Sequence, residues 1–553
     1  MADLLSTAIS GLTAYQRNLA VVGNNITNVN TEGYSRQSAE LVSRAPTPNG
    51  SGFVGNGVEV STVRRIYDQF LGGQVTSRTS SFQQMNTLYN LAARVDNALA
   101  GESSSLSPSI QAFFNAVQDV SNNPTSIPSR EVMILEATNL AYRFQSLNQQ
   151  FDGLRDQVNA QMEVFTSEVN SIAGSIAELN QDIAIARASA AGQPPNDLLD
   201  QRDRQINRLA ELVSVNRVET DDGMTNIFIG SGQALVLGSE AASLRTTRGD
   251  FDPSQREIVF TSRTTSIPIG GQLNGGQLGG LMDFRRNVLD PAQDGLGRIA
   301  IGMADTFNAQ HQLGDDLNGN PGGLFFDAID TTSPAVFASV NNNAASGTVA
   351  VTINDSGQLK ASEYRLSYDG ANFSLLRLSD NTVVDSGFGT AALPRTVAGE
   401  GITLDLSGTV ATGDSFLIRP VRYGARDMNV ALASGAEFAA AASGNASGDN
   451  SNALALAGLQ TQKLLGNGTE TYQSSYGKVL ADVGVKTREA KVNSEAQQAL
   501  LDNAIEANSA VSGVNLDEEA ADLIKYQQAY QAAAQLVKVA DTLFQTLLNV
   551  AGR

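Results

Sequence analysis

The most versatile side chain for chemistry in this sequence is its single histidine, His311, which lies in the segment FNAQHQ. The chain has no cysteine, so zinc sites built from imidazole and thiolate lack the ligands that they need. A serine–histidine–aspartate triad would have to use His311, yet no G-x-S-x-G sequence is present. We therefore expect His311 to be a helix-end or surface residue, and we predict no catalytic, cofactor-binding or metal-binding residues.

Three acidic residues, Asp197, Asp200 and Asp203, are spaced three apart in NDLLDQRDRQ and would share one helix face. Paired carboxylates can perform acid–base chemistry, but Asp200 also precedes Arg204 by four residues. We interpret this arrangement as a surface ion pair that contributes little to stability.

Two glycine-rich segments resemble ligand-binding loops only superficially. In DDLNGNPGG, residues 315–323, the glycine and the closing glutamate of a calcium loop are not at the required positions. The segment GGQLNGGQLGG lacks the Lys-Ser/Thr of a phosphate loop. We predict a plain turn for the first segment and a tight strand-to-helix turn for the second.

Charge and length restrict the classes of function. With 553 residues, of which 57 are Asp or Glu and 37 are Lys or Arg, the chain carries a net charge of −20 and should fold as several domains. Phosphate backbones and anionic lipid surfaces would repel such a chain, so we expect no nucleic-acid partner and no membrane insertion. The N-terminus also lacks the basic start and apolar block of a secretory signal.

Both ends of the chain carry apolar residues at helical spacing, typical of helices that pack along one edge. The N-terminal seam consists of Leu5, Ala8, Leu12, Tyr15, Leu19, Val22 and Ile26. The C-terminal seam consists of Leu523, Tyr526, Tyr530, Ala533, Val537, Ala540, Phe544 and Leu547. Because such long, weakly charged seams stand at the termini, we expect them to contact further copies of the chain.

A turn rich in asparagine and glycine follows the first helix, and we predict that it reverses the chain. Its defining residues are Asn24, Asn25, Asn28, Asn30, Thr31, Gly33 and Tyr34. Short strands should follow in YSRQSAELV and GVEVSTVRRIYD. Residues 75–215 then have helical periodicity, with a break at GQPPND, where Asn196 is a candidate N-cap of the returning helix.

These end segments resemble a known family, the axial proteins of the bacterial flagellum, which are rod, hook and hook-associated proteins. The resemblance lies in NNITNVNTEGYSRQ (24–37) and VNLDEEAADLIKYQQAYQAAAQLV (514–537). GNGVEVSTVRRIYDQFL (55–71), PNDLLDQRD (195–203) and GGQLGGLMDFR are more similar to hook-associated proteins than to rod or hook proteins.

The resemblance implies an α+β multidomain fold. Its paired N- and C-terminal helices would form a coiled-coil core, with a long helical-bundle shaft and inserted β-rich outer domains. We divide the chain into an axial core (1–74 and 505–553), helical shaft (75–215, 275–312 and 428–504) and β-rich segments (216–274 and 313–427).

The implied function is that of an extracellular structural protein which polymerises at the hook tip and joins hook to filament. The implied partners are further copies of the chain, the hook protein, and the next hook-associated protein on the filament side. A type III export apparatus, and an export chaperone bound to the C-terminal helix, would deliver the chain without a cleaved signal. Two alternatives remain at this point: a hook or rod protein, and a secreted enzyme or effector that uses the same export route.

Overall fold

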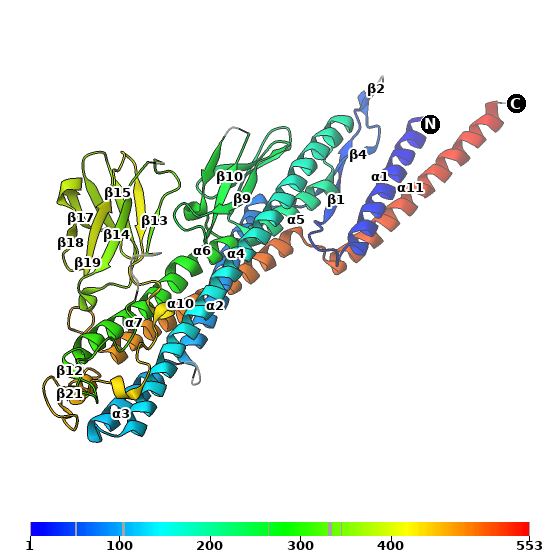
Figure 1. Cartoon of the computed structure of the whole chain (residues 1–553). Helices are drawn as coiled ribbons and strands as arrows, with labels where there is room; N and C mark the ends of the chain where they lie inside the picture. The colour runs from blue at the N-terminus through cyan, green and yellow to red at the C-terminus, as the bar shows by residue number, and fades with distance from the viewer. Residues whose placement is uncertain are drawn as a thin grey trace.

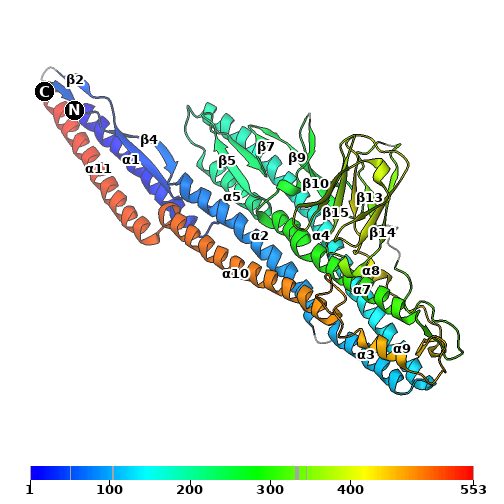
Figure 2. The ribbon, with the colours of Figure 1, turned by 90° about the vertical axis from the view of Figure 1, so that its left-hand side faces the viewer.

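Long helices run along most of the molecule and bring the two chain termini to the same end (Figures 1 and 2). The computed structural model describes residues 2–49, 52–101, 105–263, 265–329, 335–343 and 345–551. Helices α2 (Gln69–Ala100) and α10 (Tyr472–Ser512) lie side by side, as Figure 2 shows. Helix α4 (Ile127–Ser189) has 63 residues and therefore spans about 95 Å.

Helix α4 is continuous because its apolar residues recur every three or four positions and face the other helices of the bundle. Its side chains buried on this face include Met133, Ala137, Leu140, Phe144, Leu147, Phe151, Val158, Met162, Val169, Ile172, Ile176 and Ile183. After Ser189 the chain turns through left-handed Ala191 and Gly192, and α5 (Asn196–Leu212) returns along α4. The predicted helical character of residues 75–215 is confirmed, with α3 (Ser107–Asn122) completing that stretch.

The helical segment that contains Pro291 is interrupted just before this residue. Helix α6 (Gly276–Phe284) passes into a π-helical turn, Arg285–Leu289, before α7 (Asp290–His311) continues with Pro291 in its first turn. The glycine-rich segment before α6 forms the predicted strand-to-helix turn, since Gly275 and Gly276 have positive φ angles of 70° and 59°.

The first β unit, residues 215–268, shares its core with the helical bundle. Its four-stranded sheet has the order β5-β6-β7-β8, with β5 Val215–Glu219, β6 Thr225–Ile229, β7 Gln233–Leu237 and β8 Glu240–Ala241. Its three-stranded sheet has the order β11-β10-β9, with β9 Ser243–Arg248, β10 Arg256–Thr261 and β11 Ser266–Pro268. Ile227, Leu244 and Ile258 are buried in the same cluster as the side chains of α4.

The second β unit, residues 336–418, has a separate hydrophobic core, in which Leu366, Phe373 and Leu404 are buried. Five strands have the order β13-β20-β15-β16-β17: β13 Val336–Ala338, β15 Tyr364–Tyr368, β16 Phe373–Arg377, β17 Thr382–Phe388 and β20 Ser415–Ile418. Three strands have the order β14-β19-β18: β14 Thr348–Ile353, β18 Arg395–Val397 and β19 Ile402–Ser407. This unit stands to one side of the bundle, over α7 (Figure 1).

The chain ends form an antiparallel pair of helices, α1 (Ala2–Thr27) and α11 (Leu516–Ala551) (Figure 1). The predicted strands after the first turn are present as β1 (Gln37–Ser43) and β4 (Val58–Arg65), which pair and lie against α1. A short hairpin of β2 (Thr47–Asn49) and β3 (Gly52–Val54) connects them.

Residues 428–504, which we predict as helical shaft, contain no α-helix in their first part, residues 428–450. After α8 (Gly424–Asp427) the chain is extended, and β21 (Ala441–Ala442) pairs with β12 (Gly314–Asp315). The helix preference of the alanine-rich stretch is overridden because Ala439 and Ala440 are fully buried there. A short 3-10 turn, Gly435–Glu437, and the helix α9 (Ser451–Gly458) are the helical parts of this stretch before α10 begins.

Candidate functional site

The asparagine-rich turn lies where the end of α1, the junction of α10 with α11, and α5 meet, and we call this region the elbow. Side-chain hydrogen bonds close the turn: Asn28 donates to Asn24 at 2.9 Å, and Thr31 donates to Asn28 at 3.1 Å. Gly33 has a φ angle of +68°, which favours glycine, and Arg204 lies against its Cα. Asn30 is exposed.

Asn25 is the central residue of the elbow and is only 1% exposed. Its amide donates to the carbonyl oxygen of Gln37 at 2.9 Å and to Glu519 Oε2 at 3.0 Å. Its Oδ1 accepts from the Tyr34 hydroxyl at 2.8 Å and from the backbone N–H of Gln37 at 3.0 Å. All four hydrogen-bonding positions of the amide are therefore used.

Tyr34 stays a hydrogen-bond donor over the whole physiological pH range. Burial, reinforced by the carboxylates of Asp200, Asp197 and Glu519, raises the pKa of its hydroxyl to about 12.

Arg36 joins the N-terminal turn to the C-terminal helices. Its backbone N–H donates to the carbonyl oxygen of Ser512, the last residue of α10, at 2.8 Å. Its guanidinium donates to Glu519 and Glu518, both at 2.6 Å. Burial alone would lower the pKa of Arg36, but the two glutamates raise it above its usual value. The acidic first turn of α11 thus binds the guanidinium of Arg36. Its carboxylates are also favoured by their position at a helix N-terminus.

The carboxylates of α5 form the other side of the elbow, so the predicted surface pair of Asp200 with Arg204 is wrong. Asp200 is 2% exposed and accepts from the backbone N–H and the hydroxyl of Ser35 at 3.0 and 2.8 Å. Arg65 of β4 donates to Asp200 at 2.9 Å and to Asp203 at 2.5 Å. Gln37 donates to Asp197 at 3.3 Å.

The predicted N-cap role of Asn196 is likewise replaced by a contact with β4. Pro195 occupies the cap position, and no side chain caps α5. Asn196 instead donates to the carbonyl oxygen of Val63 at 2.8 Å and accepts from the N–H of Arg65 at 3.3 Å. The α5 helix is therefore tied to β4 by an amide as well as by carboxylates.

The two terminal seams are only partly covered within one chain. In α1, Ala8 and Val22 are buried, Leu12, Tyr15, Leu19 and Ile26 are half-buried, and Leu5 is exposed. In α11, Ala533 and Ala540 are buried, Tyr526 and Val537 are half-buried, and Leu523, Tyr530, Phe544 and Leu547 are exposed.

Helix α11 has two parallel rows of seven-residue spacing, which keeps each row on one face of the helix. The covered row is Glu519, Tyr526, Ala533 and Ala540, where Ala533 lies opposite Gly11 of α1. The open row is Leu516, Leu523, Tyr530, Val537 and Phe544. Further exposed apolar side chains lie at Leu536, Val539, Leu543 and Leu547, and on α1 at Leu4 and Ile9.

Of the two predicted positions for His311, the helix end is confirmed, because it is the last residue of α7, and the surface is wrong, because it is buried. Its Nδ1 lies 2.9 Å from the carbonyl oxygen of Gly323, and its Nε2 accepts from the backbone N–H of Ala439 at 2.9 Å. The ring is therefore neutral and holds two chain segments together. Burial lowers the pKa of His311.

The segment predicted as a plain turn, residues 315–323, is closed by Asp316. Its carboxylate accepts from the backbone N–H groups of Asn318 and Asn320 at 2.7 and 2.8 Å. Within the described residues, no group of three or more His, Cys, Asp or Glu side chains is arranged to hold a metal ion. No helix there is long and apolar enough to cross a bilayer.

Comparison with known proteins places this geometry in a family. Residues 92–326 match the family described as flagellar hook-associated protein FlgK helical domain, and residues 337–420 match the flagellar hook-associated protein 1 D2-like domain. The chain is 36% identical to flagellar hook-associated protein 1 of Salmonella typhimurium, with 100% of both chains covered. It belongs to the flagellar hook-associated protein 1 family.

Two further members of this family are also similar to the chain. Flagellar hook-associated protein 1 of Escherichia coli is 34% identical, with 100% of both chains covered. The solved structure of the flagellar hook junction protein FlgK from Burkholderia pseudomallei is 27% identical, with a TM-score of 0.73 over 80% of this chain and 100% of that chain. The resemblance seen in the sequence is thus confirmed, and the chain is a structural flagellar protein and not an enzyme.

The two chain ends also match families of flagellar rod proteins. Residues 5–34 match the flagella basal body rod protein family, and residues 507–550 match the C-terminal domain of the FlgEFG rod proteins. The ends are therefore common to axial proteins, whereas the matches over 92–326 and 337–420 exclude the alternative of a hook or rod protein.

Proposed function

We propose that this chain polymerises at the tip of the hook and connects the hook to the filament. In this arrangement α1 and α11 form a coiled coil parallel to the tube axis. The helical bundle forms the wall, and the two β units are inserted domains that face outward. Membership of the hook-associated protein 1 family supports the proposal, as does the similarity to the flagellar hook junction protein of Burkholderia pseudomallei.

The observation that carries the proposal is the open apolar row on α11, together with the exposed Leu547 beside it. Phe544 and Leu547 are 55% and 53% exposed, although both belong to a helix that is otherwise regular to residue 551. Covering a fully exposed side chain of this size contributes about 1.5–3 kcal/mol, so each half-exposed residue would contribute about 1 kcal/mol per contact. A row of such residues suits repeated contacts between copies along a helical tube.

The same row suits the other partners that we propose. The hook protein and the next hook-associated protein would meet the ring at its two faces through similar axial helices. Before assembly, an export chaperone would cover α11 and prevent early association. The chain would leave the cell through the type III export apparatus without a cleaved signal, and would become extracellular.

The test is a double substitution, Phe544→Asp with Leu547→Asp, introduced into a strain that lacks this gene. We expect the purified variant to keep the parent's circular dichroism and thermal unfolding, because both side chains are exposed. We expect cells that carry it to build hooks, to fail to retain filaments, and to release filament protein into the medium.

A matched control is Gln545→Asp with Thr546→Asp, which adds the same charge to exposed polar positions of the same turn. The control should support normal filaments. Filaments in normal number on cells with the Phe544 and Leu547 variant would show that the row makes no contact needed for assembly.

A further inference from the structure

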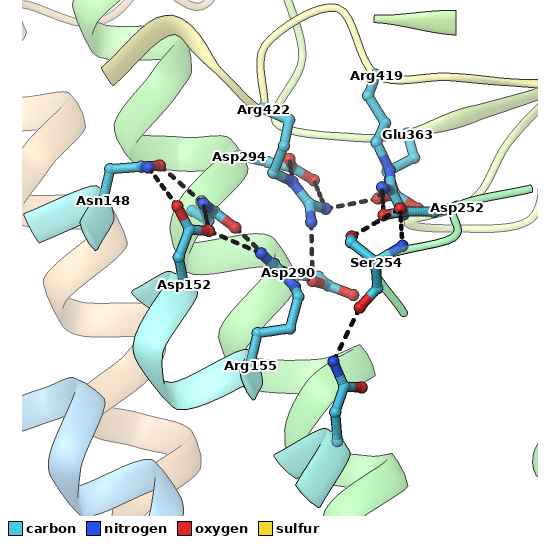
Figure 3. Close-up of polar contacts among 12 residues, drawn as sticks. Asn148, Asp152, Arg155, Asp252, Ser254, Asp290, Asp294, Glu363, Arg419 and Arg422 are labelled. Carbon is cyan, nitrogen blue, oxygen red and sulfur yellow. Dashed lines mark hydrogen bonds and ion pairs between the residues drawn. The ribbon is translucent and has the colours of Figure 1, made fainter. Parts of the chain in front are cut away.

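A buried cluster of charged side chains joins the second β unit to the rest of the molecule (Figure 3). Arg422 is 1% exposed and donates to Asp294 of α7 at 2.5 and 3.2 Å, to Asp290 at 2.8 Å, and to Glu363 at 2.5 Å. Arg419 donates to Glu363 at 2.6 Å and forms an ion pair with Asp252. The cluster therefore joins the second β unit to α7 and, through Asp252, to the first β unit. Helix α4 is the fourth part of the chain that contributes to it.

Helix α4 contributes Arg155, which donates to Asp290 at 2.9 Å and to Gln293 at 2.5 Å. Asp152 accepts from Arg155 at 2.9 Å, so the α4 side of the cluster is itself held in place. Asp252 comes from the turn between β9 and β10 of the first β unit, where Ser254 donates to it at 2.6 Å. The cluster thus ties the second β unit to the bundle and to the first β unit at once.

The two arginines of the cluster, Arg419 and Arg422, lie where the chain passes from the second β unit to the bundle. Arg419 directly follows β20, the last strand of the second β unit, and Arg422 lies two residues before α8. Both therefore stand on the segment by which the chain leaves the unit. This segment also lies directly on α7, since a Cβ added to Gly297 would collide with the carbonyl group of Val421.

Apolar contact between the second β unit and the bundle is limited by comparison. The unit has its own core, to which α7 contributes Ile301. Two cavities flank the contact, one of about 420 Å³ and one of about 690 Å³, and both are lined by Pro291 of α7 and by Ala361 and Ser379 of the unit. The unit also contacts α7 where Ser356 donates to Asp305 at 2.6 Å, and the first β unit where the backbone N–H of Val340 donates to the carbonyl oxygen of Asp250 at 2.9 Å. The cluster is the buried and charged part of this contact, and the two cavities lie beside it.

We propose that this cluster is an orientation lock, which holds the second β unit at one angle to the helical bundle. Hydrogen bonds and ion pairs are directional, so they fix an angle that apolar contact alone does not. When the lock is opened, the unit turns as a rigid body about its exit segment, into the space of the flanking cavities. This inference concerns the single chain and does not depend on the proposed place of the protein in the flagellum.

The test measures the distance between the second β unit and the bundle by double electron–electron resonance between two spin labels. Because the natural chain has no cysteine, two introduced cysteines carry the only labels. Val383 on β17 and Val485 on α10 are suitable sites, since they are 53% and 65% exposed. We expect one narrow distance distribution in the labelled parent, and a distribution at least twice as wide after Arg422→Met.

The matched control is Arg365→Met, which removes an exposed arginine of β15 in the same unit and should leave the distribution narrow. Hydrogen exchange of α2 and α10 reports whether the bundle is still folded. If Arg422→Met prevents folding, Asp252→Ala decides the question, because it removes the partner of Arg419 in the first β unit and should also broaden the distribution. A broad distribution in the parent, or a narrow one in a folded Arg422→Met or Asp252→Ala variant, would overturn the proposal.

Discussion

Replacing Asn25 tests whether the elbow holds the terminal helices to the bundle. Asn25→Ala removes four hydrogen bonds and leaves the Tyr34 hydroxyl, both backbone groups of Gln37 and one oxygen of Glu519 without this partner. Each such bond contributes about 1 kcal/mol, and a buried group left unpaired costs about 1–3 kcal/mol. Because water can reach part of the space left by the side chain, we expect a total loss of roughly 3 kcal/mol.

The isosteric change Asn25→Asp should be more harmful at neutral pH. It turns the amide nitrogen into an oxygen that lies at the 3.0 Å contact with Glu519 Oε2 and at the 2.9 Å contact with the carbonyl oxygen of Gln37. Two buried carboxylates at this separation cannot both stay ionised without a large cost. We therefore expect the loss caused by Asn25→Asp to shrink as the pH falls and one carboxylate takes a proton.

The assay is native-state hydrogen exchange at the backbone N–H of Arg36, which bonds to Ser512 across the elbow. A loss of about 3 kcal/mol corresponds to roughly a hundredfold faster exchange by local opening. Asn30→Ala is the control, since Asn30 belongs to the same turn and is exposed. Equal exchange rates in the Asn25→Ala and Asn30→Ala variants would refute the view that Asn25 holds the elbow together.

Three further changes follow from the geometry. The pKa of His311 is lowered on folding, so below pH ~6.5 the unfolded chain takes up a proton before the folded chain does. The contribution of His311 to stability should therefore be complete above that pH, and the free energy of unfolding should fall by up to about 1.4 kcal/mol per pH unit below it. Denaturation at several pH values should show this slope in the parent and not in His311→Gln. Gly276→Ala should cost more than about 2 kcal/mol in thermal unfolding, because φ is +59° and the new Cβ would meet the backbone of Leu212; unchanged stability would contradict this. Asp200→Ala should lower the free energy of unfolding by roughly 3 kcal/mol, because it leaves the partly buried Arg65 with fewer acceptors. Denaturant unfolding that matches the parent would count against the elbow as described.

The sequence predicts local structure well where one physical cause dominates. Helix α4 follows from apolar spacing over its whole length, and the turn at Gly275 and Gly276 follows from residues that accept positive φ angles. The position of the first chain reversal follows in the same way from Asn24 to Tyr34. In each case the deciding interactions lie within a few residues of one another, so they are visible in the sequence.

The elbow partners were not predictable in this way because they join residues far apart in the chain. Asp200 has Arg204 at the local helix spacing, yet it binds Ser35 and Arg65, more than 130 residues away. The sequence predicts a helix end or the surface for His311. The helix end is correct, but only the fold brings Gly323 and Ala439 to its buried ring. The sequence does contain one signal for the elbow, since the acidic first turn of α11 and Arg36, which closely follows the asparagine-rich turn, have opposite charges.

Contacts between copies and the angle of the terminal helices depend on different interactions in this molecule, and this difference affects the proposed assembly. Burial of apolar surface is non-directional, so the open row of α11 can hold copies together without fixing the angle at which they meet. The elbow fixes a different angle, the one between the terminal helices and the bundle of the same chain, because Asn25, Arg36 and Asp200 bond in defined directions. In the proposed ring, substitution of Phe544 should therefore reduce the number of copies incorporated. Substitution of Asn25 should instead allow incorporation but produce junctions of irregular shape, which electron microscopy of isolated hooks would distinguish.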